Sequence, residues 1–473
     1  MIPKRNISFL AASFLFEMAF LPHMYAGNQL AATCSYTDVA AAVAAASRGD
    51  TVSVPSGSCQ WNTTLSVAES ITLQGAGIDT TTITAAAGIS TNGLIFYFPA
   101  DAASESGFTF SVSGFTFDTN GLATDGIHIR NMSSDWVQIR IYENKFVDAS
   151  TTSTYRMIRN EGTIKGVIHS NTFSTAKKKM VDSYGRNTIE DWSDLPFEFG
   201  SSNNIYIEDN TFTHLDTPHS CGQGGRNVIR YNTYILNKNS TMNPWLDAHG
   251  NQNALSCVSW STRGAEWYGN IITSTTNKEI IGLSQRGGQA LGFFNKVVTS
   301  AAGNHFILWE EYTDTSCSET YTLHINNSYY WGNFLNDTPI IYQITMDNYD
   351  RDVPTANNPP VLVENTTHWL QRSGVFDGTG GVAAGGGVGC GTLAARPSSC
   401  TPGVGYWATD QSCTDLNGMV GVNPATPISG TLYKCTAPNT WTAYYTPYPY
   451  PHPLREERAA GPPQAPQGLR VTN

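Results

Sequence analysis

Two residues capable of acid–base chemistry stand close together in the stretch "NPWLDAHGNQ", where Asp247 and His249 are two positions apart. In an extended segment such side chains point to the same face, so the carboxylate can orient or charge the imidazole for general acid–base catalysis. The same pair could help to hold a divalent cation, and an Asp–His pair beside glycine also occurs as a simple turn-stabilising hydrogen bond. The sequence leaves these three interpretations open.

Further charged residues follow in "STRGAEWYGN", "SQRGGQ" and "WEEY". An arginine can neutralise a uronate carboxylate or a developing enolate, and a glutamate can serve as acid or base. If these segments stack on one another, their charges fall along one strip, although an Arg–Glu surface pair is the alternative for Arg263 and Glu266. The catalytic candidates are Asp247, His249, Arg263, Glu266, Arg286 and Glu310.

Aromatic and polar residues near these segments are candidates for substrate binding. Exposed indoles stack on the apolar faces of sugar rings, whereas packing in the core is the competing explanation for each tryptophan. The candidates for substrate binding are His219, Trp245, Trp260, Trp267, Trp309 and Glu198. No cofactor is certain; calcium is a candidate, with Asp247 and Asp216 as its ligands.

Composition limits the class of partner. Only 14% of the residues are charged and the formal net charge is -11, which argues against nucleic acid as a partner. A lightly charged surface with aromatic residues suits neutral polymers, and it suits anionic polymers if cations or a local basic strip intervene. We therefore expect a polysaccharide as the partner.

The start of the chain and the cysteines indicate export. Residues 1–26 are predicted to be a signal peptide, with Lys4 and Arg5 before an apolar run, and nothing later approaches the length of a transmembrane span. We expect a secreted monomer that is not inserted into a membrane after signal removal. Nine cysteines fit an oxidising compartment. The expected bridges are Cys34 with Cys59 and two among Cys390, Cys400, Cys413 and Cys435; Cys257 could pair with Cys317, which leaves Cys221 over.

Asparagine marks an internal repeat, because it recurs after short alternating strands in motifs such as "SNTF" and "DNTF". Asparagine tolerates the left-handed conformation of a sharp turn, and stacked asparagines can hydrogen-bond between rungs. We expect the apolar residue two positions later to point inward. Such a repeat is typical of a solenoid, whose largest insertions, 174–206 and 236–266, should border the functional face. The marker residues are Asn144, Asn171, Asn210, Asn232, Asn270, Asn295 and Asn327.

The opening "DVAAAVAAASRGDTVSVPSG", the strand "ITLQGAG" and the asparagine-marked rungs resemble the right-handed parallel β-helix of the pectate-lyase-like superfamily. The resemblance covers about residues 34–350 and implies fold more than activity. "PWLDAHG" is similar to the Trp-Ile-Asp-His element of pectate lyases, but Ala248 separates the acid from the histidine, and the Arg-x-Pro-x-x-Arg element is missing. The Asn-x-Asp and paired-Asp strands of polygalacturonases are also missing. No catalytic residue is therefore transferred from either branch.

The expected fold is all-β: a right-handed parallel β-helix with a short N-terminal capping helix and a disulfide-tied C-terminal appendage. The expected parts are the signal peptide, the β-helix over 27–350, a Gly-rich and aromatic appendage over 351–454, and a Pro-rich tail or linker over 455–473.

The expected function is cleavage of a polysaccharide in a groove along the solenoid. A lyase is favoured over a glycoside hydrolase, because β-elimination needs a base near the C5 proton of a uronate and positive charge against its carboxylate. A carbohydrate-binding or adhesion solenoid without catalysis is the alternative.

Overall fold

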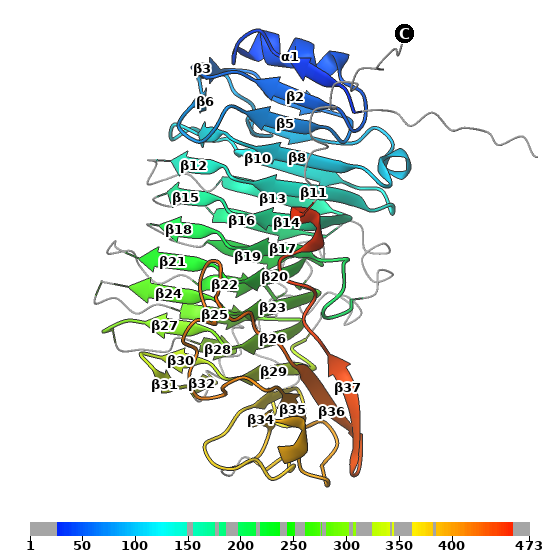
Figure 1. Ribbon diagram of the computed structural model, residues 1–473, viewed down its shortest axis with the longest axis vertical. Helices are drawn as coiled ribbons and strands as arrows, with labels where there is room; N and C mark the ends of the chain where they lie inside the picture. Colours follow the sequence, from blue (N-terminus) through cyan, green and yellow to red (C-terminus); the bar gives the residue numbers. More distant parts are fainter. Residues whose placement is uncertain are drawn as a thin grey trace, which may run out of the picture.

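The computed structural model describes residues 26–148, 155–175, 179–185, 197–213, 218–236, 244–250, 261–274, 276, 281–301, 306–308, 324–340, 343–344, 362–381 and 385–456. Over most of these residues the chain winds into a right-handed parallel β-helix, which confirms the expected fold (Figure 1). A typical turn of the helix, or rung, adds one strand to each of three long sheets, A, B and C, and strands of neighbouring rungs pair in parallel.

Sheet A consists of β1 (Asn28–Leu30), β2 (Thr51–Val54), β5 (Thr72–Gly75), β8 (Thr109–Ser113), β11 (Val137–Tyr142), β14 (Ile164–His169), β17 (Ile205–Glu208), β20 (Arg226–Arg230), β23 (Gly264–Tyr268), β26 (Gln289–Phe293), β29 (Ser328–Trp331) and β33 (His368–Leu370). Sheet B consists of β3 (Gly57–Trp61), β6 (Thr81–Ala85), β9 (Thr116–Asp118), β12 (Lys145–Asp148), β15 (Thr172–Thr175), β18 (Thr211–Thr213), β21 (Thr233–Leu236), β24 (Ile271–Ser274), β27 (Lys296–Val298), β30 (Phe334–Leu335) and β31 (Thr338–Pro339). Sheet C consists of β4 (Leu65–Val67), β7 (Ile95–Tyr97), β10 (Ile127–Asn131), β13 (Arg156–Gly162), β16 (Lys179–Tyr184), β19 (His219–Gly222), β22 (Pro244–Ala248), β25 (Ile281–Gln285), β28 (Phe306–Leu308) and β32 (Gln343–Ile344).

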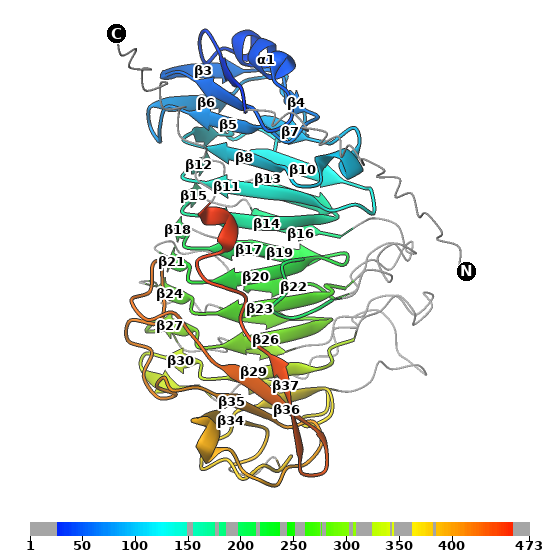
Figure 2. The same ribbon diagram turned by 45° about the vertical axis from the view of Figure 1, so that its right-hand side comes forward.

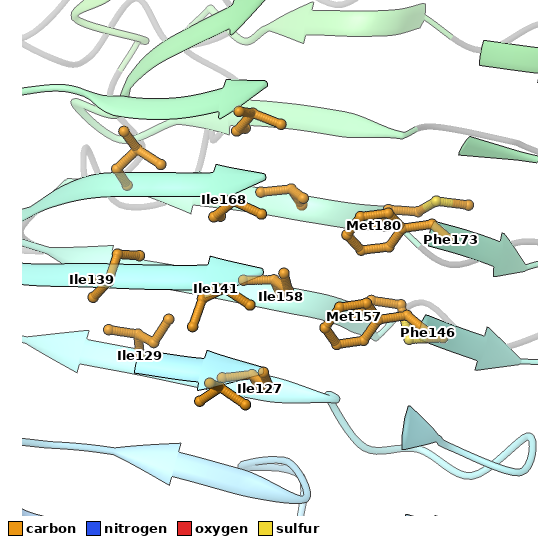
Figure 3. Close-up of a cluster of buried hydrophobic side chains, with 14 of the residues drawn as sticks. Ile127, Ile129, Ile139, Ile141, Phe146, Met157, Ile158, Ile168, Phe173 and Met180 are labelled. Carbon is orange, nitrogen blue, oxygen red and sulfur yellow. The ribbon is translucent and has the colours of Figure 1, made fainter. Parts of the chain in front are cut away.

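The side chains that point into the helix form a continuous apolar core, because equivalent positions of successive rungs carry similar residues (Figure 3). Ile127 and Ile158 pair on adjacent strands of sheet C, and both are fully buried. On sheet B the rings of Phe146, Phe173 and Phe212 stack with centroids 4.8 and 4.6 Å apart. Each of these rings lies two positions after a marker asparagine, so the prediction that this position points inward is confirmed. Stacking therefore buries a core that no single rung could bury alone.

A ladder of buried asparagines joins the rungs at the turn from sheet A to sheet B. Each side-chain amide donates to the carboxamide oxygen of the next asparagine, at 2.9 to 3.2 Å. The ladder residues are Asn144, Asn171, Asn210, Asn232, Asn270, Asn295 and Asn333.

The ladder differs from the sequence prediction in two respects. Asn333 takes the place that was expected for Asn327, which instead accepts a hydrogen bond from Lys434 at 2.9 Å. The positive φ lies one residue earlier than predicted, for example at Ser170 (φ 55°) before Asn171. The residue before each asparagine adopts the left-handed conformation of the turn. The side-chain amide of the asparagine can then donate to backbone carbonyls, as Asn171 does to Ile141 and His169.

Helix α1 (Tyr36–Ala45) covers the N-terminal end of the solenoid (Figure 1). Ser35 caps it, since its side chain accepts a hydrogen bond from the backbone N–H of Asp38. The buried side chains of Val39 and Ala42 face the first rungs. This helix closes an open end of the core, as the sequence predicted.

The C-terminal region forms a separate fourth sheet, which lies at the other end of the solenoid (Figure 1). It consists of β34 (Val388–Gly391), β35 (Gly405–Ala408), β36 (Thr431–Ala437) and β37 (Thr440–Tyr445). The disulfides Cys390–Cys413 and Cys400–Cys435 tie this region together, and Cys34–Cys59 ties the first rungs. Cys221 forms no disulfide and is buried, whereas Cys257 and Cys317 lie outside the described residues.

After β37 the chain turns back and runs along the outer face of sheet A past β17 and β14 (Figure 2). It reaches β11, where Arg140 donates to the carbonyl of Arg455 at 2.9 Å. We call residues 446–456 the strap. Arg230 on sheet A donates to the backbone carbonyls of Tyr448 and Pro449 at 2.7 and 2.8 Å. The backbone N–H of His452 donates to Glu208 at 2.9 Å, and that carboxylate also pairs with Arg230. The strap therefore buries charged groups on the outer face of sheet A.

The two stretches that were predicted to be insertions are not insertions alone. The stretch 174–206 contains β16, and 236–266 contains β22, so each carries a strand of sheet C between connecting residues. The irregular spacing of the marker asparagines therefore reflects the variable length of the connections that precede and follow the strands of sheet C. Among the described residues, no helix is long and apolar enough to span a membrane.

Candidate functional site

The outer face of sheet C carries a row of polar side chains, one strand after another. On β16, β19, β22 and β25 the in-register residues are Asp182, Ser220, Asp247 and Ser284. The positions before and after them point into the core. Because adjacent strands lie about 4.8 Å apart, this row places polar groups at regular steps along the solenoid.

Asp247, His249 and Arg286 converge on this face; we call them the Asp247 cluster. Arg286 donates from Nε to Oδ1 of Asp247 at 2.9 Å and from Nη2 to Oδ2 at 2.6 Å. His249 Nε2 lies 2.8 Å from Oδ2 of the same carboxylate, and Arg286 Nη2 contacts both nitrogens of the ring. The sequence prediction placed these residues together, and the structure brings all three into contact.

Charge and burial differ across the Asp247 cluster. Burial acts to raise the pKa of Asp247, but the charges of Arg286 and His249 and their hydrogen bonds outweigh it and hold the pKa well below its ordinary value. The side chains of Asp247 and Arg286 are 3% and 6% exposed, whereas that of His249 is 16% exposed. The cluster is thus a buried carboxylate that holds a partly exposed imidazole.

The backbone of neighbouring rungs fixes these positions. The N–H of His249 donates to the carbonyl of Cys221 on the preceding rung, and the N–H of Arg286 donates to the carbonyl of Ala248, each at 2.8 Å. Both residues stand immediately beyond a strand of sheet C. These two backbone hydrogen bonds, which follow the ends of β22 and β25, therefore orient the side chains of His249 and Arg286 toward Asp247.

A second cluster on this face was missed by the sequence reasoning. Arg156 donates to Oδ2 of Asp182 at 2.7 Å and to the hydroxyl of Tyr184 at 2.8 Å, and that hydroxyl donates to Asp182 at 2.7 Å. Asp182 is fully buried; burial acts to raise its pKa, but Lys179 and Arg156 bring the pKa below its ordinary value. A signal was present in "MVDSY", where Asp182 and Tyr184 are two positions apart and so share one face of an extended strand.

A third cluster lies further toward the N-terminal end, around Glu161. His128 Nε2 is 3.0 Å and Arg130 Nε 3.6 Å from Oε2, and Arg159 donates to Oε1 at 2.8 Å. Burial opposes these contacts, but they lower the pKa of Glu161 to about 2. Charged groups therefore follow the outer face of sheet C from β10 to just beyond β25.

Two predicted catalytic residues lie away from this face. Glu266 is on β23 of sheet A, where it accepts hydrogen bonds from the N–H of Gly200 and the hydroxyl of Tyr445, both at 2.7 Å. It is fully buried beneath the C-terminal region, so it does not fit a catalytic role. Arg263 precedes β23 at the corner between sheets C and A, where its N–H donates to the carbonyl of Gly225 at 3.1 Å. The predicted strip thus holds only for its members on sheet C.

Two predicted substrate-binding residues are inside the core. His219 Nε2 hydrogen-bonds to the hydroxyl of Tyr234 at 2.7 Å, and burial lowers the pKa of His219 to about 3. Trp267 is 1% exposed and points into the solenoid, opposite to its neighbour Glu266. Neither can contact a polymer, because both belong to the inward positions of their strands.

The remaining predicted residues give little information about the site. Glu198 is exposed before β17. Trp245 lies on β22, but its side chain is outside the described part of the chain, as are Asp216, Trp260, Trp309 and Glu310. Within the described residues, no three His, Cys, Asp or Glu side chains are grouped to hold a metal ion. Of the two predicted calcium ligands, Asp247 has both oxygens on Arg286.

The strand order defines the molecule as a right-handed parallel β-helix protein with a charged outer face on sheet C. No protein-family model matches the sequence, and no curated protein is significantly similar to it. Among solved structures, ORF18 of Geobacillus virus E2 is similar over 86% of this chain and 72% of its own, with 10% identity and a TM-score of 0.33. The A-module of the mannuronan C-5 epimerase AlgE4 of Azotobacter vinelandii is similar over 68% of this chain and 95% of its own, with 12% identity and a TM-score of 0.34. At identities and TM-scores this low, the activity of a similar protein cannot be assigned to this chain.

Proposed function

We propose that the protein is an exported enzyme that cleaves an acidic polysaccharide by β-elimination on the outer face of sheet C. The observation that carries the proposal is the Asp247 cluster, in which a buried carboxylate, a partly exposed imidazole and a guanidinium meet on one face. β-Elimination from a uronate needs a base at the C5 proton and positive charge beside the carboxylate. His249 and Arg286 supply these two groups.

The proposed reaction assigns one role to each side chain. Arg286 pairs with the uronate carboxylate and stabilises the enolate that forms when the C5 proton leaves. His249 takes that proton, while Asp247 orients the ring and stabilises the imidazolium. The C4–O4 bond then breaks as the C4–C5 double bond forms, and His249 returns the proton to the leaving O4. Because Arg286 also contacts the ring of His249, its guanidinium has to shift toward the substrate carboxylate before the ring can act as base.

The two other charged clusters support an extended substrate. They lie on the same face of sheet C as the Asp247 cluster, on β10, β13 and β16. Arg156 belongs to the second cluster, and Arg130 and Arg159 belong to the third. Such cations suit the carboxylates of a uronic acid polymer. The net charge of -11 for the whole chain makes a local basic strip necessary for such a polymer.

Export is part of the same proposal. The three disulfides described above are typical of proteins that fold in an oxidising compartment. The predicted signal peptide at residues 1–26 agrees with this, and a polysaccharide is met outside the cell. Expression with and without residues 1–26, followed by assay of the medium, tests it.

A panel of uronic acid polymers and neutral polymers tests the activity. Elimination is expected to produce ultraviolet absorbance from the new conjugated double bond, which His249→Ala and Asp247→Asn should reduce at least 100-fold. Asp410→Asn, which removes an exposed carboxylate in the C-terminal region, is the control and should keep full activity. A chelator added in parallel decides whether a divalent cation assists.

Other products would contradict elimination in distinct ways. New reducing ends without absorbance would indicate hydrolysis. Inversion at C5 without chain cleavage, seen by NMR, would show that the proton is abstracted but the C4–O4 bond survives. Activity that both variants retain would refute the site.

A binding solenoid without catalysis is the second candidate. It is favoured by the fact that the members of the Asp247 cluster satisfy one another through hydrogen bonds and ion pairs. Retention of several polymers on a column of the protein, with no turnover of any, would support this function.

A further inference from the structure

A row of residues crosses the outer face of sheet C at the carboxyl ends of its strands. The strand register runs from Phe98 through Arg130, Glu161 and Tyr184 to His249. The strands that carry or precede these residues follow one another along the solenoid from β7 to β22 (Figure 2). Because adjacent strands lie about 4.8 Å apart, the five steps from β7 to β22 span about 24 Å. Phe98 and the Asp247 cluster therefore lie at opposite ends of one row.

Phe98 presents an aromatic ring to solvent at its end of the row. It is 47% exposed, and it is the only exposed aromatic residue among the side chains that the structure describes. Its backbone N–H donates to the carbonyl of Val67 at 3.0 Å. The ring of Phe96, on the same face of β7, stacks against it, with centroids 5.9 Å and planes 3° apart. A ring held in this way loses little conformational entropy when a ligand binds to it.

The neighbours of Phe98 leave this ring accessible. Ala68, which is level with Phe98 on the side of β4, is small and exposed. The contact with Phe96 is the one ring contact of Phe98 within the described residues, and no cation lies over its ring there. A sugar ring can therefore approach Phe98 from solvent.

Arg130 supplies a cation on the next strand, level with Phe98. Its side chain is 42% exposed, and its Nε lies 3.6 Å from Glu161, which is too far for a hydrogen bond. That carboxylate has closer partners in His128 and Arg159, at 3.0 and 2.8 Å. Arg130 itself donates no hydrogen bond within the described part of the chain. Its guanidinium is therefore available to an acidic ligand.

We propose that Phe98 and Arg130 form a remote subsite for an acidic polysaccharide chain that lies along the row as far as His249. One sugar ring stacks its apolar face on Phe98, and the acidic group of that sugar pairs with Arg130. An isolated exposed phenylalanine is ordinary on a protein surface. The unpaired cation beside it, and the row that joins both residues to His249, indicate a ligand.

The inference rests on the proposed function for the acidic polysaccharide and for the catalytic end of the row. It goes further in naming the length of the ligand. A chain that spans about 24 Å reaches both ends of the row, so long chains should bind more tightly than short oligomers that reach only one end.

Calorimetric titration of the full chain with oligomers of two lengths tests the proposal. The probes are oligomers of galacturonic acid, of mannuronic acid and of neutral galactan, each in a length that spans about 24 Å and a length that does not. They are measured in an Asp247→Asn background, and the absence of cleaved product is checked after each titration. Phe98→Ala and Arg130→Gln should each weaken binding of the tightest long acidic oligomer about tenfold or more, which is about 1.4 kcal/mol.

Two matched controls lie outside sheet C. Ile78→Ala shortens another exposed hydrophobic side chain, which is 39% exposed, and Lys145→Gln removes a cation on sheet B. Each should change the affinity by less than about twofold. Circular dichroism and melting temperature verify the fold of every variant.

Two further variants of Phe98 distinguish stacking from a structural role. Phe98→Trp keeps a flat ring and should bind the long acidic oligomer at least as tightly as the parent chain. Phe98→Leu keeps an apolar side chain without a ring face, so it should lose as much affinity as Phe98→Ala. Equal losses in all three variants would show that the ring face is not what binds.

The outcomes separate the remote subsite from the proposed function. Weaker binding in the Phe98→Ala and Arg130→Gln variants supports the subsite even if no polymer is turned over, in which case only the enzymatic proposal fails. If polymers are turned over, the ratio of kcat/KM for long to short substrates should fall in the same variants. Unchanged affinity for long acidic oligomers in both variants overturns the subsite, whether or not the chain is a lyase. Neutral oligomers that bind as tightly as acidic ones, or no binding of any acidic oligomer, also overturn it.

Discussion

Glu266 is a fully buried carboxyl group that lies between sheet A and the C-terminal region. Burial raises its pKa to about 7, although the N–H of Gly200, the hydroxyl of Tyr445 and the charge of Arg230 all act to lower it. Below pH 4.5 the group is protonated in both the folded and the unfolded chain. As pH rises from 4.5 to 7 the unfolded chain loses the proton and the folded chain keeps it, so folding stability falls.

The size of this effect follows from the two pKa values. One pKa unit is worth about 1.4 kcal/mol, so raising the pKa from 4.5 to about 7 destabilises the folded state above pH 7 by about 3 kcal/mol. Glutamine cannot ionise, and it can still accept from Gly200 and donate to the Tyr445 oxygen. Glu266→Gln should therefore gain about 2.5 kcal/mol in stability relative to the native chain between pH 5 and pH 8.

Urea denaturation of both chains at pH 5 and pH 8 measures this gain. Comparing the variant with the native chain cancels every other titrating group, because those groups are common to both. Glu198→Gln is the matched control, since Glu198 is exposed two residues before Gly200, the residue that donates to Glu266. It should change stability by less than about 0.5 kcal/mol. If Glu266→Gln and the native chain differ by the same free energy at both pH values, the raised pKa is refuted.

Three other changes test the scaffold. Asn232→Ala removes side-chain hydrogen bonds to Ile207, Arg230 and Asn270 and should lower the free energy of unfolding, measured by urea denaturation, by about 3 kcal/mol. The control Asn92→Ala, at an exposed position, should lower it by less than about 0.5 kcal/mol. Equal losses in the two variants would contradict the stabilising role of the ladder. Replacing Cys34 and Cys59 together by alanine opens a loop of 25 residues and should cost about 3.5 kcal/mol on the chain-entropy estimate; an unchanged melting temperature would contradict it. Arg230→Met removes one of the two arginines that pair with Glu208, Arg455 being the other, and should cost about 3 kcal/mol. It should also speed proteolysis within the strap, whereas native-like cleavage rates would show that the strap does not depend on Arg230.

The sequence was most informative where structure depends on short-range turn chemistry. The asparagine ladder and the inward aromatic residues repeat in a fixed local pattern, so six ladder positions and the fold could be predicted. Asn327 in "NNSY" fits the local motif, and only the pairing of β30 with β27 shows that Asn333 takes the ladder position.

The site was harder to predict, because distant parts of the chain decide whether an outward-pointing side chain is covered or open to solvent. Glu266 and Trp267 are neighbours on β23, and both faces of that strand are covered, one by the core and one by the C-terminal region. A local pattern cannot reveal that second cover. The Asp247 cluster could be foreseen because Asp247 and His249 are near in sequence and Arg286 stands one rung later. The cluster around Asp182 was missed because β16 lies in a stretch that was expected to be an insertion. The cluster around Glu161 was missed because its members come from two strands, β10 and β13, that only the rung pairing brings together.

The strap has a consequence for the order in which the molecule can form. Its contacts with Glu208 and Arg230 join residues more than 200 positions apart in the chain, and it lies on rungs that are synthesised long before it. Those rungs can stack as they emerge, one upon the next, but the carboxylates and Arg230 on the outer face of sheet A stay open to water until the last residues arrive. The last step of assembly is therefore the binding of the strap to rungs that formed before it. A nascent chain that lacks the strap has a stacked β-helix whose charged groups on sheet A are still exposed to water.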